Sequence, residues 1–343
     1  MRPTASIPSS AAASPVPDIP PARVYPPPTS ADCSGVGPCV LAVGNFDGVH
    51  LGHASIVERL VAMGRRLGVP AVAVTFDPHP AVVVGRGDPP PRLSTVARRV
   101  ELLLGLGLAR VLVQPTVPPL VAMQADAFYE RQLRDSLAAI GIVEGADFRF
   151  GHRRGGDTAL LERLCRRDGL AIEIVPPLEL GGEAVSSSRI RRLIAAGEVD
   201  QAASLCVAGY RISGRVIEGA RRGRTLGFPT ANLAGITTML PAEGVYAAIA
   251  SGPGVGREPL PAAVNIGPKP SFADDSPSVE AHLIGFSGDL YGKTLDVDFL
   301  RRLRDTRRFE SVEALRGQLT SDTKRAVELA EENGVSPGSC DAT

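Results

Sequence analysis

The chain has 343 residues, which is enough for two ordinary domains. Hydrophobic residues make up 44% of it and charged residues 22%, as in soluble globular proteins and unlike disordered or fibrous chains. Basic and acidic side chains number 37 each, so the formal net charge is zero. We therefore expect no general attraction to nucleic acid or to an anionic membrane.

Cysteine usage and apolar runs favour the cytoplasm. The five cysteines include no C-x-x-C pair, which argues against a disulfide framework and against a zinc site. No apolar run forms a signal-peptide core or reaches the roughly 18 residues that would suggest a membrane span. The sequence thus predicts a cytoplasmic protein without membrane contact.

Residues 1–36 are rich in Pro, Ser and Ala and contain little apolar periodicity. Such a segment cannot bury enough apolar surface to order itself, so we expect it to be disordered or loosely attached. A start codon assigned too early would explain this composition equally well.

From residue 37 the pattern changes to strands that alternate with helices. Apolar runs predict strands, and apolar residues at helical spacing predict helices. The expected strands are residues 39–46, 69–76, 109–114 and 170–175, and the expected helices are residues 53–67, 96–106 and 126–140. This alternation predicts a doubly wound α/β domain with a parallel sheet, which we assign to residues 37–205.

After about residue 205, short β-like segments follow one another with Gly and Pro between them. The expected strands are residues 210–217, 244–250, 262–266, 279–286 and 294–303, and no helix is expected among them. This pattern predicts a small antiparallel barrel at residues 206–335. Ser311 is a suitable N-cap for a closing C-terminal helix, which Gly334 would end.

The strongest local pattern stands where the first strand meets the first helix, and reads Gly44-Asn45-Phe46-Asp47-Gly48-Val49-His50-Leu51-Gly52-His53. In open α/β sheets, ligands bind at the carboxyl ends of strands, and a helix N-terminus attracts phosphate. His50 and His53 are three residues apart, so in a first helical turn their rings face the same way. Two imidazoles there can stabilise charge on nucleotide phosphates, although histidines at this spacing more often only cap or pack the turn.

The H-x-G-H pattern resembles the signature of the nucleotidyltransferase superfamily, and with Gly44 to Gly48 it resembles the FAD synthetase branch. Three further motifs of that branch follow in order: Phe76-Asp77-Pro78-His79-Pro80, Gly145 to Gly151, and Ser186-Ser187-Ser188-Arg189-Ile190-Arg191, where Ser188 replaces the family's Thr. The resemblance implies that His50, His53 and Arg191 are catalytic. It also implies that ATP and FMN bind to Gly44, Asn45, Phe46, Asp47, Gly48, Asp147, Ser186, Ser187 and Ser188.

In the barrel half, clustered glycines precede a Thr and an Asn, in Gly214 to Gly219 and then Gly223-Arg224-Thr225-Leu226-Gly227-Phe228-Pro229-Thr230-Ala231-Asn232. Glycines let a backbone wrap around phosphate, and side-chain oxygens suit a hard cation. On composition alone, however, a Gly-rich hairpin with a Pro turn would be favoured.

The full pattern resembles riboflavin kinase, whose Pro-Thr-Ala-Asn motif supplies Thr and Asn to the metal and the nucleotide. The resemblance implies that Glu280 is the catalytic base, although a lone Glu on a strand is otherwise usually solvent-facing. It implies that Mg²⁺ binds to Thr230 and Asn232, and that ATP and flavin bind to Gly219, Arg224, Gly227, Phe228, Pro229, Thr230 and Asn232. Supporting matches are Gly244-Val245-Tyr246, Asn265-Ile266-Gly267, Pro270-Ser271-Phe272, Val279-Glu280-Ala281-His282, Leu290-Tyr291-Gly292 and Leu303-Arg304.

Together the two resemblances imply a bifunctional bacterial riboflavin kinase/FAD synthetase, with a nucleotidyltransferase domain followed by a kinase barrel. Such an enzyme phosphorylates riboflavin to FMN and adenylylates FMN to FAD, releasing pyrophosphate, with ATP as co-substrate and Mg²⁺ as cofactor. Two alternatives stay open: an adenylyl- or cytidylyltransferase with one activity and an accessory barrel, and a non-catalytic flavin-binding regulator. Neither nucleic acid nor membrane is an expected partner, and self-association is compatible with the sequence.

Overall fold

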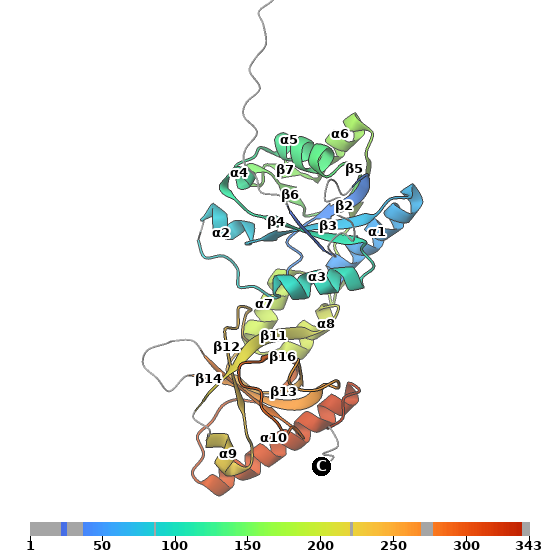
Figure 1. Cartoon of the computed structure of the whole chain (residues 1–343). Coiled ribbons are helices and arrows are strands. Elements are labelled where there is room, and N and C mark those ends of the chain that lie inside the picture. The colour runs from blue at the N-terminus through green and yellow to red at the C-terminus, as the bar shows by residue number, and fades with distance from the viewer. Residues whose placement is uncertain (1–21, 26–36, 86, 220–221, 269–276, 338–343) are drawn as a thin grey trace, which may run out of the picture.

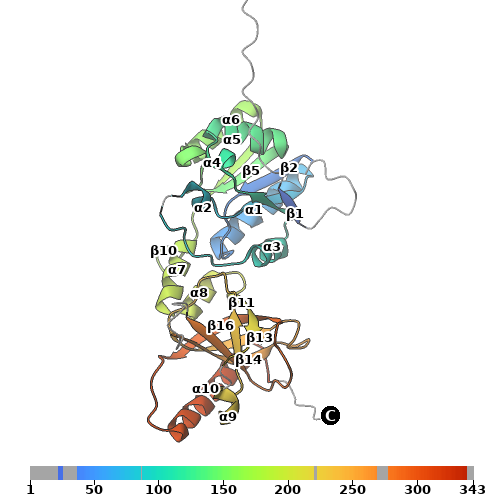
Figure 2. The same cartoon turned by 60° about the vertical axis from the view of Figure 1, so that its left-hand side comes forward.

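The described chain forms a sheet covered by helices and a barrel, and further helices lie between these two bodies in both views (Figures 1 and 2). The structure, a computed structural model, describes residues 22–25, 37–85, 87–219, 222–268 and 277–337. Within these ranges, no helix is both long and apolar enough to cross a membrane.

The first body contains a six-stranded sheet in the order β1-β4-β3-β2-β5-β8. Five of its strands are parallel: β2 (Cys39–Val43), β3 (Ala71–Asp77), β4 (Arg110–Pro115), β5 (Ala139–Gly145) and β8 (Ala171–Val175). The chain order reverses at β2, because β3 and β4 lie on one side of it and β5 and β8 on the other. The predicted doubly wound sheet is confirmed, and such a reversal is where sheets of this class bind ligands.

Helices cover both faces of this sheet and bury its central strands. They are α1 (Leu51–Leu67), α2 (Pro80–Val84), α3 (Val96–Gly105), α4 (Pro118–Val121), α5 (Ala125–Phe128), the π-helix η1 (Tyr129–Ser136) and α6 (Thr158–Asp168). In β2, Leu41 and Val43 face the core shared with η1 and α6, whereas Val40 and Ala42 face the core shared with α1 and α3. Burial on both faces explains why this strand is a continuous apolar run.

The predicted helix over residues 126–140 is wrong at its C-terminal end. Helical structure stops at Ser136, Ala138 takes a φ of 49°, and β5 begins at the next residue. The apolar residues of this stretch form a buried strand because β5 pairs with β2 on one side and β8 on the other. The helix α6 was not predicted.

An edge strand, β1 (Arg23–Tyr25), pairs antiparallel with β4. It lies inside the segment that we expected to be disordered or loosely attached, so for these residues that expectation is corrected. Val24 packs against the core of η1 and α6, and Tyr25 against the opposite core. The other residues of 1–36, apart from Ala22, lie outside the described residues.

The second body is a closed antiparallel barrel in the order β11-β12-β15-β14-β13-β16, which confirms the predicted barrel. Its strands are β11 (Tyr210–Ile217), β12 (Ala231–Ala234), β13 (Gly244–Ser251), β14 (Leu260–Gly267), β15 (Ser278–Leu283) and β16 (Thr294–Arg304). The closing helix α10 (Val312–Glu332) is capped by Ser311, whose hydroxyl accepts the Ala314 N–H at 3.0 Å. The expectation of no helix between the strands is wrong, because α9 (Arg222–Leu226) precedes β12.

The helices α7 (Ser187–Ala196) and α8 (Val199–Leu205) lie between the two bodies and pack against the barrel. Side chains of both helices share one core with barrel residues such as Tyr246 and Phe299. Two short ribbons complete the first body: β6 (Arg149–Phe150) with β7 (Gly156–Asp157), enclosing the 3₁₀-helix η2 (His152–Arg154), and β9 (Glu179–Leu180) with β10 (Glu183–Ala184).

Candidate active sites

The first predicted motif forms a tight turn between β2 and α1, where the order of the sheet reverses. Phe46, Gly48 and Val49 take positive φ values of 47°, 82° and 35°. A positive φ is unusual for a β-branched residue such as Val49, so surrounding contacts must offset its cost. Gly48 also leaves room for Leu93, whose Cδ1 would be 3.0 Å from an added Cβ. Strain of this kind concentrates at functional sites.

His50 and His53 cap the N-terminus of α1 reciprocally. The Nδ1 atom of each ring accepts the backbone N–H of the other residue at 3.3 Å, and the ring centroids are 3.6 Å apart. Because each Nδ1 is an acceptor, the proton of each neutral ring is on Nε2. Burial lowers the pKa of His50 to about 4, and burial together with the neighbouring His50 lowers the pKa of His53 well below its usual value. At pH 7 both rings are therefore neutral hydrogen-bond donors and not cations.

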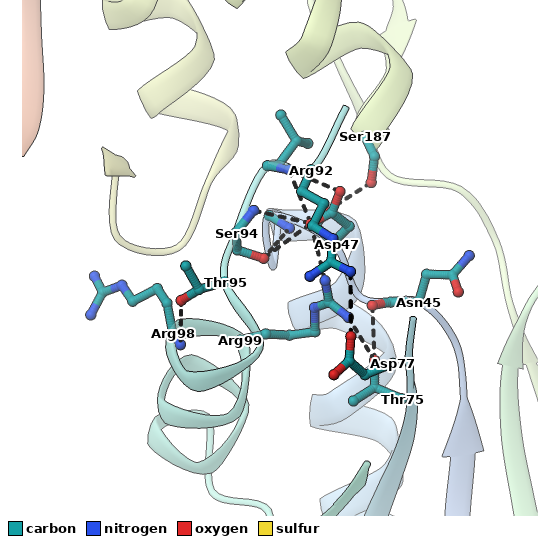
Figure 3. Close-up of polar contacts among 12 residues, drawn as sticks. Asn45, Asp47, Thr75, Asp77, Arg92, Ser94, Thr95, Arg98, Arg99 and Ser187 are labelled. Atoms are coloured by element: carbon teal, nitrogen blue, oxygen red, sulfur yellow. Dashed lines mark hydrogen bonds and ion pairs between the residues drawn. The ribbon is translucent and has the colours of Figure 1, made fainter. Parts of the chain in front are cut away.

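The carboxylate of Asp47 joins three segments around this turn (Figure 3). It is only 4% exposed and accepts the backbone N–H groups of Leu93 and Ser94 at 3.0–3.1 Å. It also pairs with the guanidinium groups of Arg99 at 3.2 Å and Arg191 at 2.6 Å. The oxygens of Asp47, a predicted ligand contact, are thus engaged by protein donors that fix Arg191 beside the turn.

Arg191 reaches this site from the second turn of α7. Ser186 caps that helix by accepting the Arg189 N–H at 3.2 Å, and the Ser187 hydroxyl donates to the Asp47 carbonyl at 2.9 Å. Arg191 Nε also donates to the Pro91 carbonyl at 2.7 Å. The structure therefore brings together the predicted His–His turn and the predicted serine–arginine motif, which are more than 130 residues apart in the sequence.

The remaining predicted residues of this site follow β2 and β5, except Ser188, which lies on α7. Asp147 follows β5, is exposed, and lies near enough to His50 for its charge to raise the pKa of that ring against the larger effect of burial. The Asn45 carbonyl accepts the Thr75 hydroxyl at 3.0 Å, and its side chain points away from Asp47 (Figure 3). Gly44 packs under the Phe46 ring, which would be 3.2 Å from an added Cβ. Ser188 is exposed.

Two buried ionisable residues of this site were not predicted. Arg99 is 5% exposed and also donates to the Thr75 hydroxyl at 3.1 Å. Its position on the apolar face of α3, beside Val100, was a signal in the sequence. Glu144 near the end of β5 accepts the Val43 N–H at 2.7 Å, and burial raises the pKa of its carboxyl well above its usual value. The sequence gives no signal for it, because the expected helix ends at residue 140 and Glu144 belongs to no expected strand.

The second predicted site lies on the outer face of the barrel, where β12, β15 and β14 are adjacent. The strand register pairs Asn232 with Glu280 and Glu280 with Asn265. Paired residues of antiparallel strands point to the same face, and here the neighbouring Val279 and Ala281 fill the barrel core. The three polar side chains thus form one outward row, and each is half-buried. Glu280 is not a freely exposed strand residue, and Asn265 is an unpredicted polar neighbour.

The glycines before Asn232 allow close approaches within this site. A Cβ on Gly219 would lie 2.2 Å from Asn232 Nδ2, and a Cβ on Gly223 would lie 2.2 Å from the Phe228 carbonyl oxygen. Gly227 takes a φ of 88°, which favours glycine. The predicted Gly219 therefore makes room for the Asn232 amide. The side chain of the predicted Arg224, and the matching residues 270–272, lie outside the described residues.

A cavity of about 460 Å³ lies between the end of β16 and α10. Its lining includes Leu303, Arg304, Gln318 and Asp322, and the Arg304 guanidinium pairs with the Asp322 carboxylate at 2.8 Å. In the strand register, Asn265 pairs with Val245, and Val245 pairs with Arg304. Arg304 therefore belongs to the same row of paired residues as Glu280. The cavity and Glu280 thus lie at one level of the barrel wall.

The comparisons with known proteins agree with both family resemblances. The sequence model of the FAD synthetase family matches residues 34–189, and that of the riboflavin kinase family matches residues 207–330. The bifunctional riboflavin kinase/FMN adenylyltransferase of Pseudomonas fluorescens is 38% identical over 85% of this chain and 93% of its own length. The corresponding protein of Escherichia coli K12 is 34% identical over 85% and 92%.

Among solved structures, a crystal structure described as a macrolide-efflux protein from Streptococcus pneumoniae has a TM-score of 0.77 and 29% identity. The likeness covers 84% of this chain and 94% of that one, so it extends over both bodies. The match of both family models in order, and of relatives along nearly their whole length, confirms the predicted family. The chain belongs to the bifunctional riboflavin kinase/FMN adenylyltransferase family.

Proposed function

We propose that this chain phosphorylates riboflavin to FMN and adenylylates FMN to FAD at two separate sites, using ATP in each reaction. We assign the adenylyltransferase to residues 37–205 and the kinase to residues 206–335. The observation that carries this proposal is the presence of two distinct polar sites on two bodies. One is the His50–His53 turn with Arg191, and the other is the row of Asn232, Glu280 and Asn265.

In the kinase reaction, Glu280 is the general base. Its carboxylate takes the proton of the ribityl 5′-hydroxyl, that oxygen bonds to the γ-phosphorus of ATP, and the bond between the γ-phosphorus and the departing ADP oxygen breaks. The half-buried Glu280 lies beside Asn232 in the strand register, so the base and the nucleotide-binding motif face one substrate.

Oxygen donors at this site fit a magnesium ion, which prefers hard oxygen ligands and keeps several waters. The Thr230 hydroxyl and the Asn232 amide oxygen would hold it, and Gly219 leaves the Asn232 amide its space. A bound ion would offset the negative charge of the transferring phosphates.

The cavity beside Arg304 is the place that we assign to the flavin ring. Three strand spacings separate Glu280 from Arg304, which is at most about 14 Å around the barrel wall. This span allows the ring to occupy the cavity while the ribityl chain extends along the wall toward Glu280.

In the transferase reaction, a phosphate oxygen of FMN bonds to the α-phosphorus of ATP, and the bond to pyrophosphate breaks. The Nε2–H groups of His50 and His53 and the N-terminus of α1 donate to the phosphates, and the Arg191 guanidinium balances their charge. Magnesium here would be held mostly by the triphosphate and water.

Product analysis tests this proposal. Purified protein is incubated with riboflavin, ATP and Mg²⁺, and flavins and nucleotides are separated by chromatography over time. We expect FMN first and FAD afterwards, with two ATP consumed and one pyrophosphate released per FAD. A single flavin product at saturating ATP would support the enzyme with one activity, and no turnover would support the regulator.

A further inference from the structure

His282 stands next to the kinase site, and its side chain has no part in the reaction proposed above. It lies two residues after Glu280 on β15, between the buried Ala281 and Leu283, so it points outward on the same face as Glu280. Ala231 pairs with Ala281, and continuing this register by one residue sets Thr230 opposite His282. The two residues of β15 thus face the two motif residues that we assign to the metal.

The ring of His282 makes two contacts with the turn that precedes Thr230. Its Nδ1 lies 2.8 Å from the Pro229 carbonyl oxygen, and because a carbonyl only accepts, Nδ1 carries the proton. Its ring also meets the edge of the Phe228 ring at 5.5 Å between centroids, with the planes 70° apart. One side chain therefore fixes both the backbone and a side chain of this turn to β15.

We propose that His282 is a positioning residue of the kinase site, which holds the Phe228–Pro229 turn on β15 so that Thr230 is set for metal-bound ATP. The inference rests on the proposed kinase function. Thr230 follows the turn directly and lies ahead of the first β12 residue, so its place depends on how the turn is held. A hydroxyl shifted by about 1 Å is enough to cost two orders of magnitude in rate.

The test compares three substitutions that separate the hydrogen bond from the ring contact. His282→Ala removes both, His282→Phe keeps an aromatic ring without the donor, and His282→Asn places an amide N–H near the position of Nδ1. His152→Ala is the matched control, because His152 Nδ1 contacts the Val121 carbonyl oxygen at 3.3 Å in the other body. FMN adenylylation by each variant, with circular dichroism, checks that the chain is folded.

In steady-state kinetics of riboflavin phosphorylation, we expect the Ala and Phe variants to raise the KM for MgATP about tenfold or more, the equivalent of one hydrogen bond of about 1.4 kcal/mol. The Asn variant should recover most of this loss, and the KM for riboflavin should change less. The inference would be overturned if, in the Ala and Phe variants, both the KM for MgATP and the kcat stayed within twofold of the values of the parent chain.

Hydrogen exchange without substrates gives a second readout that does not depend on activity. We expect faster amide exchange in peptides that contain residues 224–231 for the Ala and Phe variants, near-parental exchange for Asn, and no change for His152→Ala. Unchanged exchange in all variants would contradict the inference whether or not phosphorylation occurs. A parent chain that binds MgATP but never phosphorylates riboflavin would instead refute the proposed kinase function.

Discussion

Neutral imidazoles, and not imidazolium ions, cap the N-terminus of α1 in the first site. Both Nδ1 atoms accept backbone N–H groups, and burial lowers the pKa of each ring, to about 4 for His50. We therefore predict that the ring carbon–proton NMR signals of His50 and His53 keep their neutral-form shifts from pH 8 down to about 5.5. Assignment follows from single His→Gln variants. A titration of either ring with a midpoint near its usual 6.5 would contradict the capped, buried geometry.

Glu144 makes the stability of the folded chain depend on pH. Burial raises the pKa of its folded-state carboxyl well above the unfolded value, so its contribution is complete at low pH and is lost as pH rises through the folded pKa. Glu144→Gln keeps the acceptor for the Val43 N–H and cannot ionise. We predict that urea unfolding shows little difference between this variant and the parent chain at pH 4, and a more stable variant at pH 8. An advantage that shrinks as pH rises would contradict this assignment.

Single residues also show where sequence reasoning stops. The His50–His53 motif could be found from its resemblance to the nucleotidyltransferase signature, yet the protonation state of the two rings depends on burial, which the sequence does not give. The contact of Asp47 with Arg191 could not be foreseen, because 144 residues separate them and only the fold brings α7 to the turn. Arg99 could have been found, since an arginine on an apolar helix face requires a buried partner.

Among the elements, the Gly-rich segment before β12 contains Gly219, where glycine is required by contact and not by φ. A Cβ at Gly219 would lie 2.2 Å from the Asn232 amide, whereas Gly317 on α10 has no atom within 4 Å of an added Cβ. We predict that Gly219→Ala lowers the rate of riboflavin phosphorylation about 10²-fold, as expected if the metal ligand that we propose, Asn232, is displaced by about 1 Å. FMN adenylylation by the same variant should be unchanged.

The matched variant Gly317→Ala makes the same chemical change within a helix. There it should leave both activities intact and stabilise the chain by up to about 1 kcal/mol, because alanine loses less backbone entropy in a helix. Steady-state assays and thermal unfolding of both variants check this pair. Equal activity in the two variants would mean that Asn232 does not need its present position.

Most strands could be predicted because buried parallel strands and barrel strands have plain apolar patterns. β5 was missed since its apolar residues follow a helix without a turn signal, and only pairing with β2 makes them a strand. β12 was missed because its four residues belong to the Pro-Thr-Ala-Asn segment, which carries little β pattern of its own. Tertiary pairing decides both elements, and local sequence does not report it.

At the scale of the whole molecule, the first site is supported by the barrel. Arg191 stands on α7, while Leu193 and Ile194 of the same helix lie in the core shared with the barrel. Backbone bonds also cross between the bodies: the Met239 N–H donates to the Arg92 carbonyl at 2.7 Å, next to the Pro91 carbonyl that Arg191 contacts. The position of Arg191 therefore depends on both bodies.

We predict that a fragment of residues 1–205 loses adenylyltransferase activity although it contains every predicted residue of that site. Without the barrel, the buried side chains of α7 and α8 face water, at a cost of about 1.5–3 kcal/mol for each large one. We expect a lower Tm and at least a tenfold lower rate of FAD formation from FMN. The control is the full-length Glu280→Gln variant, in which we expect riboflavin phosphorylation to be lost although the barrel is still present. A fragment with the parental Tm and the parental rate of FAD formation would show that the first site does not need the core shared with the barrel.

The central claim is that one chain holds two independent catalytic sites, and complementation between two variants tests it most directly. In Glu280→Gln, loss of the general base should slow FMN formation by ~10² to 10⁴-fold while supplied FMN is still adenylylated. In His53→Ala, adenylylation should slow by ~10²-fold or more while FMN accumulates from riboflavin. Neither variant alone should make FAD from riboflavin at a useful rate, and a mixture of the two should do so through released FMN. If each variant lost both reactions while folded, or if both made FAD from riboflavin at the parental rate, the two-site account would be contradicted.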